Sequence, residues 1–298
     1  MSGATDPFPA DIIREFTQTA LSPDPDLARP AFLIARLGYA NLDPAPYLAR
    51  LQEMGATAAD RLAAAALPTD PHGPIEALNR YLFEDQGFAG NTANYDDPRN
   101  SFLNQVLDRR IGIPITLALV YIEVARRAGV RVDGVNFPGH FLLRFPFGPE
   151  DDHESAVFVD PFHRGAVLSA TDCRTLLRRH AGETVSFEPS LLTPATKQQI
   201  LIRMLLNLKR IYIRMRSFPQ GRALTELVLA INPSALGELR DRGLLAYHLN
   251  DFAAALRDLE AYLKFASRAD ADNAEGRDER TEIWGHVKAL RRRVASLN

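Results

Sequence analysis

Cysteine, long apolar runs and secretion signals are scarce or missing in this sequence of 298 residues. The single cysteine excludes an intramolecular disulfide and a cysteine-rich zinc site. The N-terminal residues MSGATDPFPADIIREF lack the basic segment and the following apolar segment of a secretory signal. The longest apolar runs, such as residues 113–120, fall far short of the ~20 residues that span a membrane. We therefore expect a cytoplasmic protein.

Motifs for cofactors and metals are also lacking. GRALTEL and the other glycine-containing segments have neither the spacing nor the Lys-Ser/Thr ending of a phosphate-binding loop. A metal site could be drawn from His153, Asp160 and His163 with Asp151 or Asp152, but no pair among them has the helical spacing of recurrent ligand pairs. We expect no cofactor and no metal.

Charge is almost balanced over the whole chain but not within it. Residues 1–195 contain 17 basic and 25 acidic side chains, a net charge of −8, whereas residues 196–298 contain 18 and 12, a net charge of +6. The segment 197–222 has seven basic side chains and no acidic one. The two parts therefore differ in electrostatic character, and we expect a partner to bind the C-terminal part.

Proline and aspartate divide the beginning of the chain into short helical pieces, with breaks at SPDPD, NLDPAP and LPTDPHGP. From Lys197 the pattern is helical to the end of the chain. The sequence therefore predicts three parts: a helical lead-in over residues 1–95 that packs on the core, a core over residues 96–195, and a helical domain over residues 196–298.

A well-marked helix opens the central pattern. Residues 114–127 have apolar side chains at helical spacing, with Pro114 just inside the start and Gly129 just past the end. Short β-rich pieces follow at residues 130–137, 140–147 and 156–160. A helix followed by a run of strands predicts an α+β core with antiparallel pairing.

The C-terminal part contains an internal period. Phe218 and Phe252 lie 34 residues apart, and each follows a polar turn. This spacing is the length of a tetratricopeptide repeat, in which an aromatic residue starts the second helix. The same register places Gly221 at a helix crossing and Pro233 at the end of a repeat. We predict two repeats followed by a terminal helix; the alternative is an unrelated helical bundle.

Three polar side chains are candidates for chemistry. Thr116 lies in GIPIT at the start of the central helix, His140 starts one predicted strand and Asp160 ends another. A nucleophile at a helix N-terminus, a histidine that accepts its proton and an aspartate that fixes the histidine tautomer form a catalytic triad. Papain-like and transglutaminase-like folds have this order of parts. The alternatives are a helix-capping or core Thr116, a structural His140 and a turn-forming Asp160.

Longer segments carry a family resemblance. The runs NSFLNQVLDRRIGIPITLALVYIEVARRAGV, GVNFPGHFLLRF and VDPFHRG, with the preceding LNRYLFEDQGFAGNTANYDDPRN, resemble the SirB family of bacterial proteins. The resemblance spans about residues 30–265. It implies an α+β, papain/transglutaminase-like core behind a helical N-terminal lead-in, followed by an all-α tetratricopeptide-like repeat domain. It also matches His140 and Asp160 to the family's retained histidine and aspartate.

The cysteine nucleophile of the wider transglutaminase pattern is not present at the matching position of this sequence. The wider transglutaminase pattern, Gly-x-Cys before a helix ending in Arg-x-x-Gly, places its cysteine at Pro114, and Thr116 is the nearest hydroxyl. The resemblance implies that the SirB family typically has serine or threonine at position 116. A hydroxyl is a much weaker nucleophile than a thiol unless a base is well aligned. We therefore expect a non-catalytic binding, assembly or regulatory factor; the alternative is a hydrolase or acyl-transferase built on Thr116, His140 and Asp160.

Other polar residues receive supporting roles. Asn100, Asn104 and Arg109 belong to the segment that carries the resemblance, and we expect them to satisfy turn backbone and pair charges around the cleft. Cys173 lies beyond the strands, and we expect it to be a small buried residue and not a nucleophile.

Arg203, Arg210 and Arg214 are the candidate binding residues of the basic segment. Their spacings of seven and four place them on one helix face. The default interpretation is a solvated face, followed by a surface for an acidic peptide or protein. A nucleic-acid-associated regulator that binds through residues 197–222 is the third functional alternative.

Overall fold

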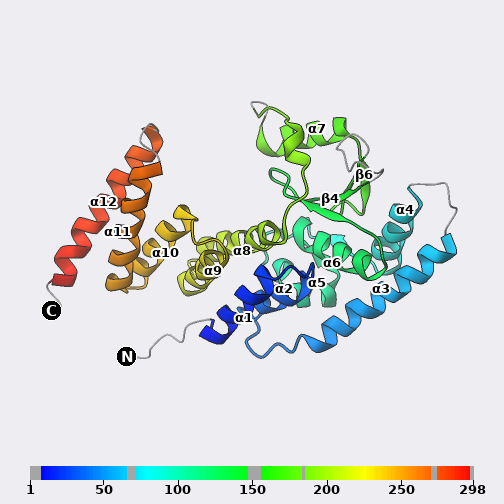
Figure 1. Cartoon of the computed structure of the whole chain (residues 1–298), viewed down its shortest axis with the longest axis horizontal. Coiled ribbons are helices and arrows are strands. Elements are labelled where there is room, and N and C mark those ends of the chain that lie inside the picture. Colours follow the sequence, from blue (N-terminus) through cyan, green and yellow to red (C-terminus); the bar gives the residue numbers. More distant parts are fainter. Residues whose placement is uncertain (1–7, 66–71, 147–155, 183–184, 270–273, 296–298) are drawn as a thin grey trace. The chain divides into compact units, whose positions relative to one another are not determined.

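The computed structural model describes residues 8–65, 72–146, 156–182, 185–269 and 274–295. The chain forms two compact units (Figure 1). The core unit runs from Thr19 to Met204, and the repeat unit combines Met1–Gln18 with Leu205–Asn298. None of the helices within the described ranges is long and apolar enough to cross a membrane.

The core unit begins with helices and continues with a buried helix and a run of strands. Its helical segments are the end of α1 (Ala10–Leu21), α2 (Ala28–Ala35), α3 (Ala45–Ala65), α4 (Gly73–Asn79), the π-helix η1 (Arg80–Asp85), the 3-10 helix η2 (Pro98–Ser101), α5 (Leu103–Arg109), α6 (Pro114–Arg127), α7 (Ala170–Ala181), the 3-10 helix η3 (Pro189–Leu192) and the start of α8 (Lys197–Arg214). Its strands are β1 (Ala89–Gly90), β2 (Ile111–Gly112), β3 (Asp133–Val135), β4 (Leu142–Phe145), β5 (Val157–Asp160) and β6 (Ala166–Leu168). This order confirms the α+β layout.

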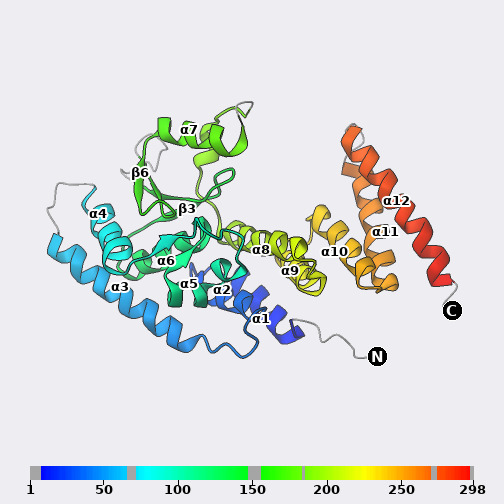
Figure 2. The ribbon, with the colours of Figure 1, turned by 180° about the vertical axis from the view of Figure 1, so that it is seen from behind.

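Helix α6 is almost completely buried in the core unit. All its residues from Pro114 to Ala125 are buried, and the helix has the predicted bounds. Gly129 follows in the left-handed region, with φ of 79°, where a glycine is preferred. Helix α3 packs along α6, and the two lie side by side in both views (Figures 1 and 2). A helix that is apolar on every side is stable only when other elements cover it completely.

A four-stranded antiparallel sheet in the order β3-β4-β5-β6 follows α6. Its register pairs Gly134 with Leu143 and Arg144 with Phe158. Three of the strands lie inside predicted ranges but are shorter, and β6 was not predicted. The parallel pair of β1 with β2 was missed as well, because two-residue strands have no readable periodicity.

The repeat unit consists of helices. After the end of α8 it contains α9 (Phe218–Ile231), α10 (Leu236–His248), α11 (Phe252–Ala269) and α12 (Ala274–Ala295). Helices α9 and α11 begin at the two phenylalanines that set the predicted period. Gly221 of α9 faces Ile213 and Leu245, so a small residue occupies a helix crossing as the register requires.

The boundary between the two units lies inside α8, and it differs from the predicted boundary at residues 195 and 196. The first two turns of α8 belong to the core unit because they contact it directly. The backbone N–H of Ala195, just before α8, donates to the carbonyl of Gly134 at 2.7 Å. Ile200 packs against Gly134, and Arg203 Nη2 donates to the carbonyl of His140 at 3.4 Å. The segment 1–18 also groups with the repeat unit instead of the lead-in.

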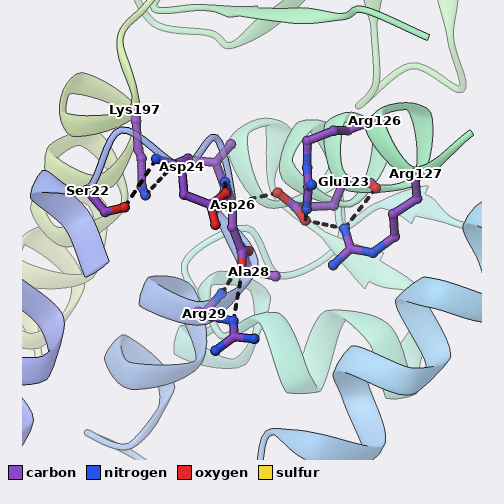
Figure 3. A network of polar contacts seen from close by, with 10 residues as sticks. Ser22, Asp24, Asp26, Ala28, Arg29, Glu123, Arg126, Arg127 and Lys197 are labelled. Atoms are coloured by element: carbon purple, nitrogen blue, oxygen red, sulfur yellow. Dashed lines mark hydrogen bonds and ion pairs between the residues drawn. The ribbon is translucent and has the colours of Figure 1, made fainter. Parts of the chain in front are cut away.

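A polar network ties three segments of the core unit together (Figure 3). Glu123 of α6 is 0% exposed, and its carboxylate accepts the backbone N–H of Leu27 at 2.8 Å. Arg126 donates to the same carboxylate at 2.9 Å, and Arg127 is ion-paired with it as well. Lys197 Nζ, at the start of α8, donates to the carbonyl of Asp24 at 2.7 Å. The connection between α1 and α2 is therefore held to both α6 and α8.

Loss of the Glu123 carboxylate should destabilise the core unit. We expect Glu123→Ala to lower the free energy of unfolding by about 3 kcal/mol, because the change removes the carboxylate that accepts the Leu27 N–H and pairs with the mostly buried Arg127. Arg126 is 34% exposed, so Arg126→Ala should cost less than about 1 kcal/mol. Urea unfolding followed by far-UV circular dichroism measures both changes. Equal losses in the two variants would contradict a dominant role for the buried carboxylate.

Candidate functional site

Asp160 lies at the C-terminal end of β5 and organises the turn that follows. Its Oδ1 accepts the backbone N–H groups of Phe162 at 2.9 Å and His163 at 3.2 Å. Its backbone carbonyl accepts the N–H of Gly165, which has φ of 77°. The side chain is 3% exposed. Because Oδ1 is committed to the turn, Oδ2 is the oxygen left to face neighbouring side chains.

Two histidines meet Oδ2 of Asp160. His140 Nε2 lies 2.9 Å away, and His163 Nδ1 lies 2.7 Å away. The contact with His140 is close but poorly aligned, since Nε2 has no hydrogen bond of acceptable geometry within the described part of the chain. Burial alone would raise the pKa of Asp160, but the two histidines outweigh it and hold the pKa of this carboxyl below its usual value. The carboxylate is therefore ionised near neutral pH.

The His140 ring is fixed by what surrounds it. His140 follows a tight turn in which its backbone N–H donates to the carbonyl of Phe137, and Gly139 has φ of 69°. The ring of His180 stacks on that of His140, with centroids 5.4 Å apart and planes 13° apart. Phe162 meets the ring edge-on at 6.2 Å. Neither His180 nor Phe162 is predictable as a neighbour of His140 from the sequence, because α7 and the turn after β5 reach His140 only through the fold.

Thr116 has a different environment. Its side chain is buried, and its hydroxyl donates to the carbonyl of Asn100 at 2.7 Å and accepts the backbone N–H of Ile113 at 3.1 Å. A Cβ on Gly112 would lie 2.8 Å from this hydroxyl, so a glycine is needed there. His140 is not among the partners of Thr116 in the described structure. The hydroxyl therefore closes the N-terminus of α6 against the preceding turn.

The predicted supporting residues lie beside this turn. Asn100 is buried, and its Nδ2 donates to the carbonyls of Asn94 at 2.7 Å and Tyr95 at 3.2 Å. Arg109 donates to Oδ1 of Asn100 at 3.3 Å and lies 3.8 Å from the carboxylate of Asp97. Asn104 is buried in α5, and its Oδ1 makes no hydrogen bond to any described residue.

Asn79 supports the site from the lead-in. It accepts the Tyr121 hydroxyl of α6 at 3.0 Å and donates to the carbonyl of Gly165 at 2.7 Å. It therefore links α6 to the turn that carries His163. No local pattern marks Asn79 in the sequence, since both partners are distant along the chain.

Three side chains are arranged as metal ligands would be. The ligand atoms of His140, Asp160 and His163 all lie within 4.8 Å of one another. Two members of the metal set considered from the sequence, Asp160 and His163, belong to this group, whereas His153, Asp151 and Asp152 lie outside the described residues. The third member of the group, His140, was not part of the metal set considered from the sequence.

Comparisons with known proteins identify the family of the chain. A family model described as transglutaminase-like superfamily matches residues 45–206, more than half of the chain. The chain belongs to this superfamily. A tetratricopeptide repeat model matches residues 208–279, which confirms the predicted repeats and the order of the two parts.

Curated relatives support the family assignment. A UPF0162 protein of Xylella fastidiosa strain Temecula1 is 41% identical over 68% of this chain and 72% of the relative. A UPF0162 protein of Vibrio cholerae is 29% identical over 65% and 70%. F-box only protein 21 of Homo sapiens is 33% identical over 59% of this chain and 28% of its own length. The predicted SirB-type combination of a transglutaminase-like domain with repeats is confirmed.

Among solved structures, the crystal structure of menin that reveals the binding site for Mixed Lineage Leukemia (MLL) protein covers 93% of this chain and 74% of its own. Its TM-score is 0.35 at 10% identity. A similarity this low carries no argument about fold or function.

The three arginines predicted to bind a partner have different surroundings. Arg203 is half-buried and contacts the transglutaminase-like core through the carbonyl of His140. Arg210 and Arg214 are exposed on the part of α8 that belongs to the repeat unit. Lys209 between them is buried and ion-paired with Glu238 at 2.5 Å. The basic segment is therefore only partly a surface feature.

Thr116 should contribute to stability through its hydroxyl. We expect Thr116→Val to lower the free energy of unfolding by about 1–3 kcal/mol, because the Asn100 carbonyl and the Ile113 N–H lose a buried partner. Thr116→Ser keeps the hydroxyl and should cost less than about 1 kcal/mol. Thermal or urea unfolding of both variants measures the difference. A Thr116→Val variant as stable as Thr116→Ser would show that the capping interaction is not needed.

Cys173 of the transglutaminase-like core should be chemically inert while the protein is folded. Its side chain is fully buried, and burial, assisted by the charges of Asp172 and Asp160, raises the pKa of the thiol to about 12. The thiolate that reacts with disulfide reagents is therefore almost absent near pH 8. We expect Ellman's reagent to detect the thiol in denaturant but not in native protein. A rapid native reaction would contradict this environment.

Proposed function

We propose that this protein is a non-catalytic member of the transglutaminase-like superfamily that binds or assembles a protein partner through its tetratricopeptide repeats. The observation that carries the proposal is the environment of Thr116. Its hydroxyl proton is directed to the Asn100 carbonyl and its oxygen accepts the Ile113 N–H, so neither is offered to His140. A nucleophilic hydroxyl needs a base within hydrogen-bond reach.

The position that a cysteine would occupy supports the same proposal. Pro114 is buried and forms the first residue of α6, where a proline fits helix geometry. Cys173, the lone thiol, packs with Val135, Phe158 and Leu177 against the sheet. Neither position offers a thiolate to His140.

Basic side chains on the repeat unit support the proposal that the partner is acidic. Arg210 and Arg214 are exposed one turn apart on α8. Grooves of helical repeats commonly take extended peptide segments, and two arginines on such a helix favour segments that carry carboxylates.

An enzymatic alternative has one observation in its favour, because His140 and Asp160 are retained in close contact. Hydrolysis or acyl transfer through Thr116 would require the hydroxyl to leave the Asn100 carbonyl. Activity of that kind toward ester or amide substrates would be lost in both Thr116→Val and His140→Ala. The cytoplasmic location stays a prediction from the sequence.

Reversal of the exposed charges tests partner binding. We expect tag-purified wild-type protein to retain an acidic protein from a lysate of the source cell, and the double variant Arg210→Glu with Arg214→Glu to lose at least about 90% of it through repulsion. Quantitative mass spectrometry of the retained proteins measures this loss.

The matched control reverses two exposed arginines elsewhere in the repeat unit, Arg257→Glu in α11 with Arg292→Glu in α12. This pair should retain the partner at nearly the wild-type level. Equal loss in both double variants would mean a nonspecific effect of net charge. Retention of nucleic acid in place of protein, abolished by moderate salt, would favour the nucleic-acid alternative.

A further inference from the structure

The arrangement of His140, Asp160 and His163 has more donor atoms than a catalytic pair needs. A single carboxylate oxygen, Oδ2 of Asp160, lies 2.9 Å from one imidazole nitrogen and 2.7 Å from another. Ligands of a zinc-sized ion lie about 2.0–2.2 Å from it, so two ligands of a tetrahedral ion are about 3.3–3.6 Å apart. The two observed separations are shorter than this range by less than about 1 Å. All three ligand atoms lie within 4.8 Å of one another, so small side-chain movements would let them share an ion.

Hydrogen bonding does not account for the buried nitrogen in this group. His140 is 4% exposed, and its Nε2 has no hydrogen bond of acceptable geometry in the described structure. A buried nitrogen whose only close polar contact is poorly aligned as a hydrogen bond gains free energy when a ligand satisfies it. An imidazole nitrogen and a carboxylate oxygen that face one another are a suitable pair of donors for a cation.

The surroundings hold the donor atoms in place. Oδ1 of Asp160 accepts two backbone N–H groups, which orients Oδ2 toward the imidazoles. The stacked ring of His180 and the edge of Phe162 fix the plane of His140. Asn79 fixes the turn of His163 through its bond to Gly165. Ligands oriented by such outer contacts bind metals more tightly than free side chains.

We propose that His140 Nε2, Asp160 Oδ2 and His163 Nδ1 bind one divalent transition-metal ion of the zinc class. Two imidazoles and one carboxylate suit Zn²⁺, Fe²⁺ or Co²⁺, whereas Mg²⁺ and Ca²⁺ prefer oxygen ligands. Three protein ligands leave at least one position for water. His163 is 55% exposed, so this position is reached from solvent. The site is independent of partner binding by the repeats.

Metal binding by chelator-treated, tag-free full-length protein tests the proposal. We expect titration with Zn²⁺ to show one equivalent bound at micromolar or lower concentration, and Co²⁺ to give visible ligand-field absorption. His163→Asn should weaken Zn²⁺ binding at least about tenfold, since one of three ligands is lost. Its circular dichroism should remain that of the wild type, because the His163 side chain is mostly exposed.

Two histidine variants serve as controls. His286→Asn in α12 removes an unrelated histidine and should bind Zn²⁺ as the wild type does. His180→Asn removes the stacked neighbour without removing a donor atom, so one equivalent should still bind. Absence of stoichiometric Zn²⁺ binding, or equal affinities of the His163→Asn and His286→Asn variants, would overturn the proposal. Displacement of Zn²⁺ by a modest excess of Mg²⁺ would also overturn it.

Discussion

The complete burial of α6 is the constraint on which the rest of the core unit depends. A helix enclosed from Pro114 to Ala125 can carry a polar side chain only if another segment satisfies it. Thr116, Tyr121 and Glu123 each meet this requirement with a different partner: the 3-10 turn before α5, the end of α4, and the connection between α1 and α2. The polar groups of α6 therefore hold three other parts of the chain in place. One of them, the end of α4, also holds the turn that carries His163, through Asn79.

Much of this fold is readable from the sequence where local signals are strong. The bounds of α6 follow from its apolar spacing, Pro114 and Gly129, and the starts of α9 and α11 follow from the two phenylalanines of the repeat period. The extent of the core unit does not follow in the same way. Its boundary within α8 depends on contacts of Ile200 and its neighbours with strands far away along the chain. The prolines that mark breaks between helices in the sequence do not indicate such contacts between distant segments.

The candidate site was predicted in part for the same reason. His140 and Asp160 follow from their places at predicted strands, and the structure brings them together. The commitment of Thr116 to the Asn100 carbonyl depends on a turn whose conformation no sequence pattern specifies. His180 belongs to the surface pattern of an amphipathic helix, so only the packing of that helix beside Gly139 shows its contact with His140.

The ion pairs of the repeat unit distinguish the first repeat from the second. Lys209 in α8 reaches Glu238 and Asp241 in α10, and Arg222 in α9 reaches Asp251. Asp251 lies just before α11, so each of these pairs joins one helical hairpin to the following one. Exchanging the hairpins, or inserting a consensus repeat between them, would leave the buried ammonium of Lys209 without its carboxylates. These ion pairs therefore favour one sequential order of two repeats whose backbones are alike.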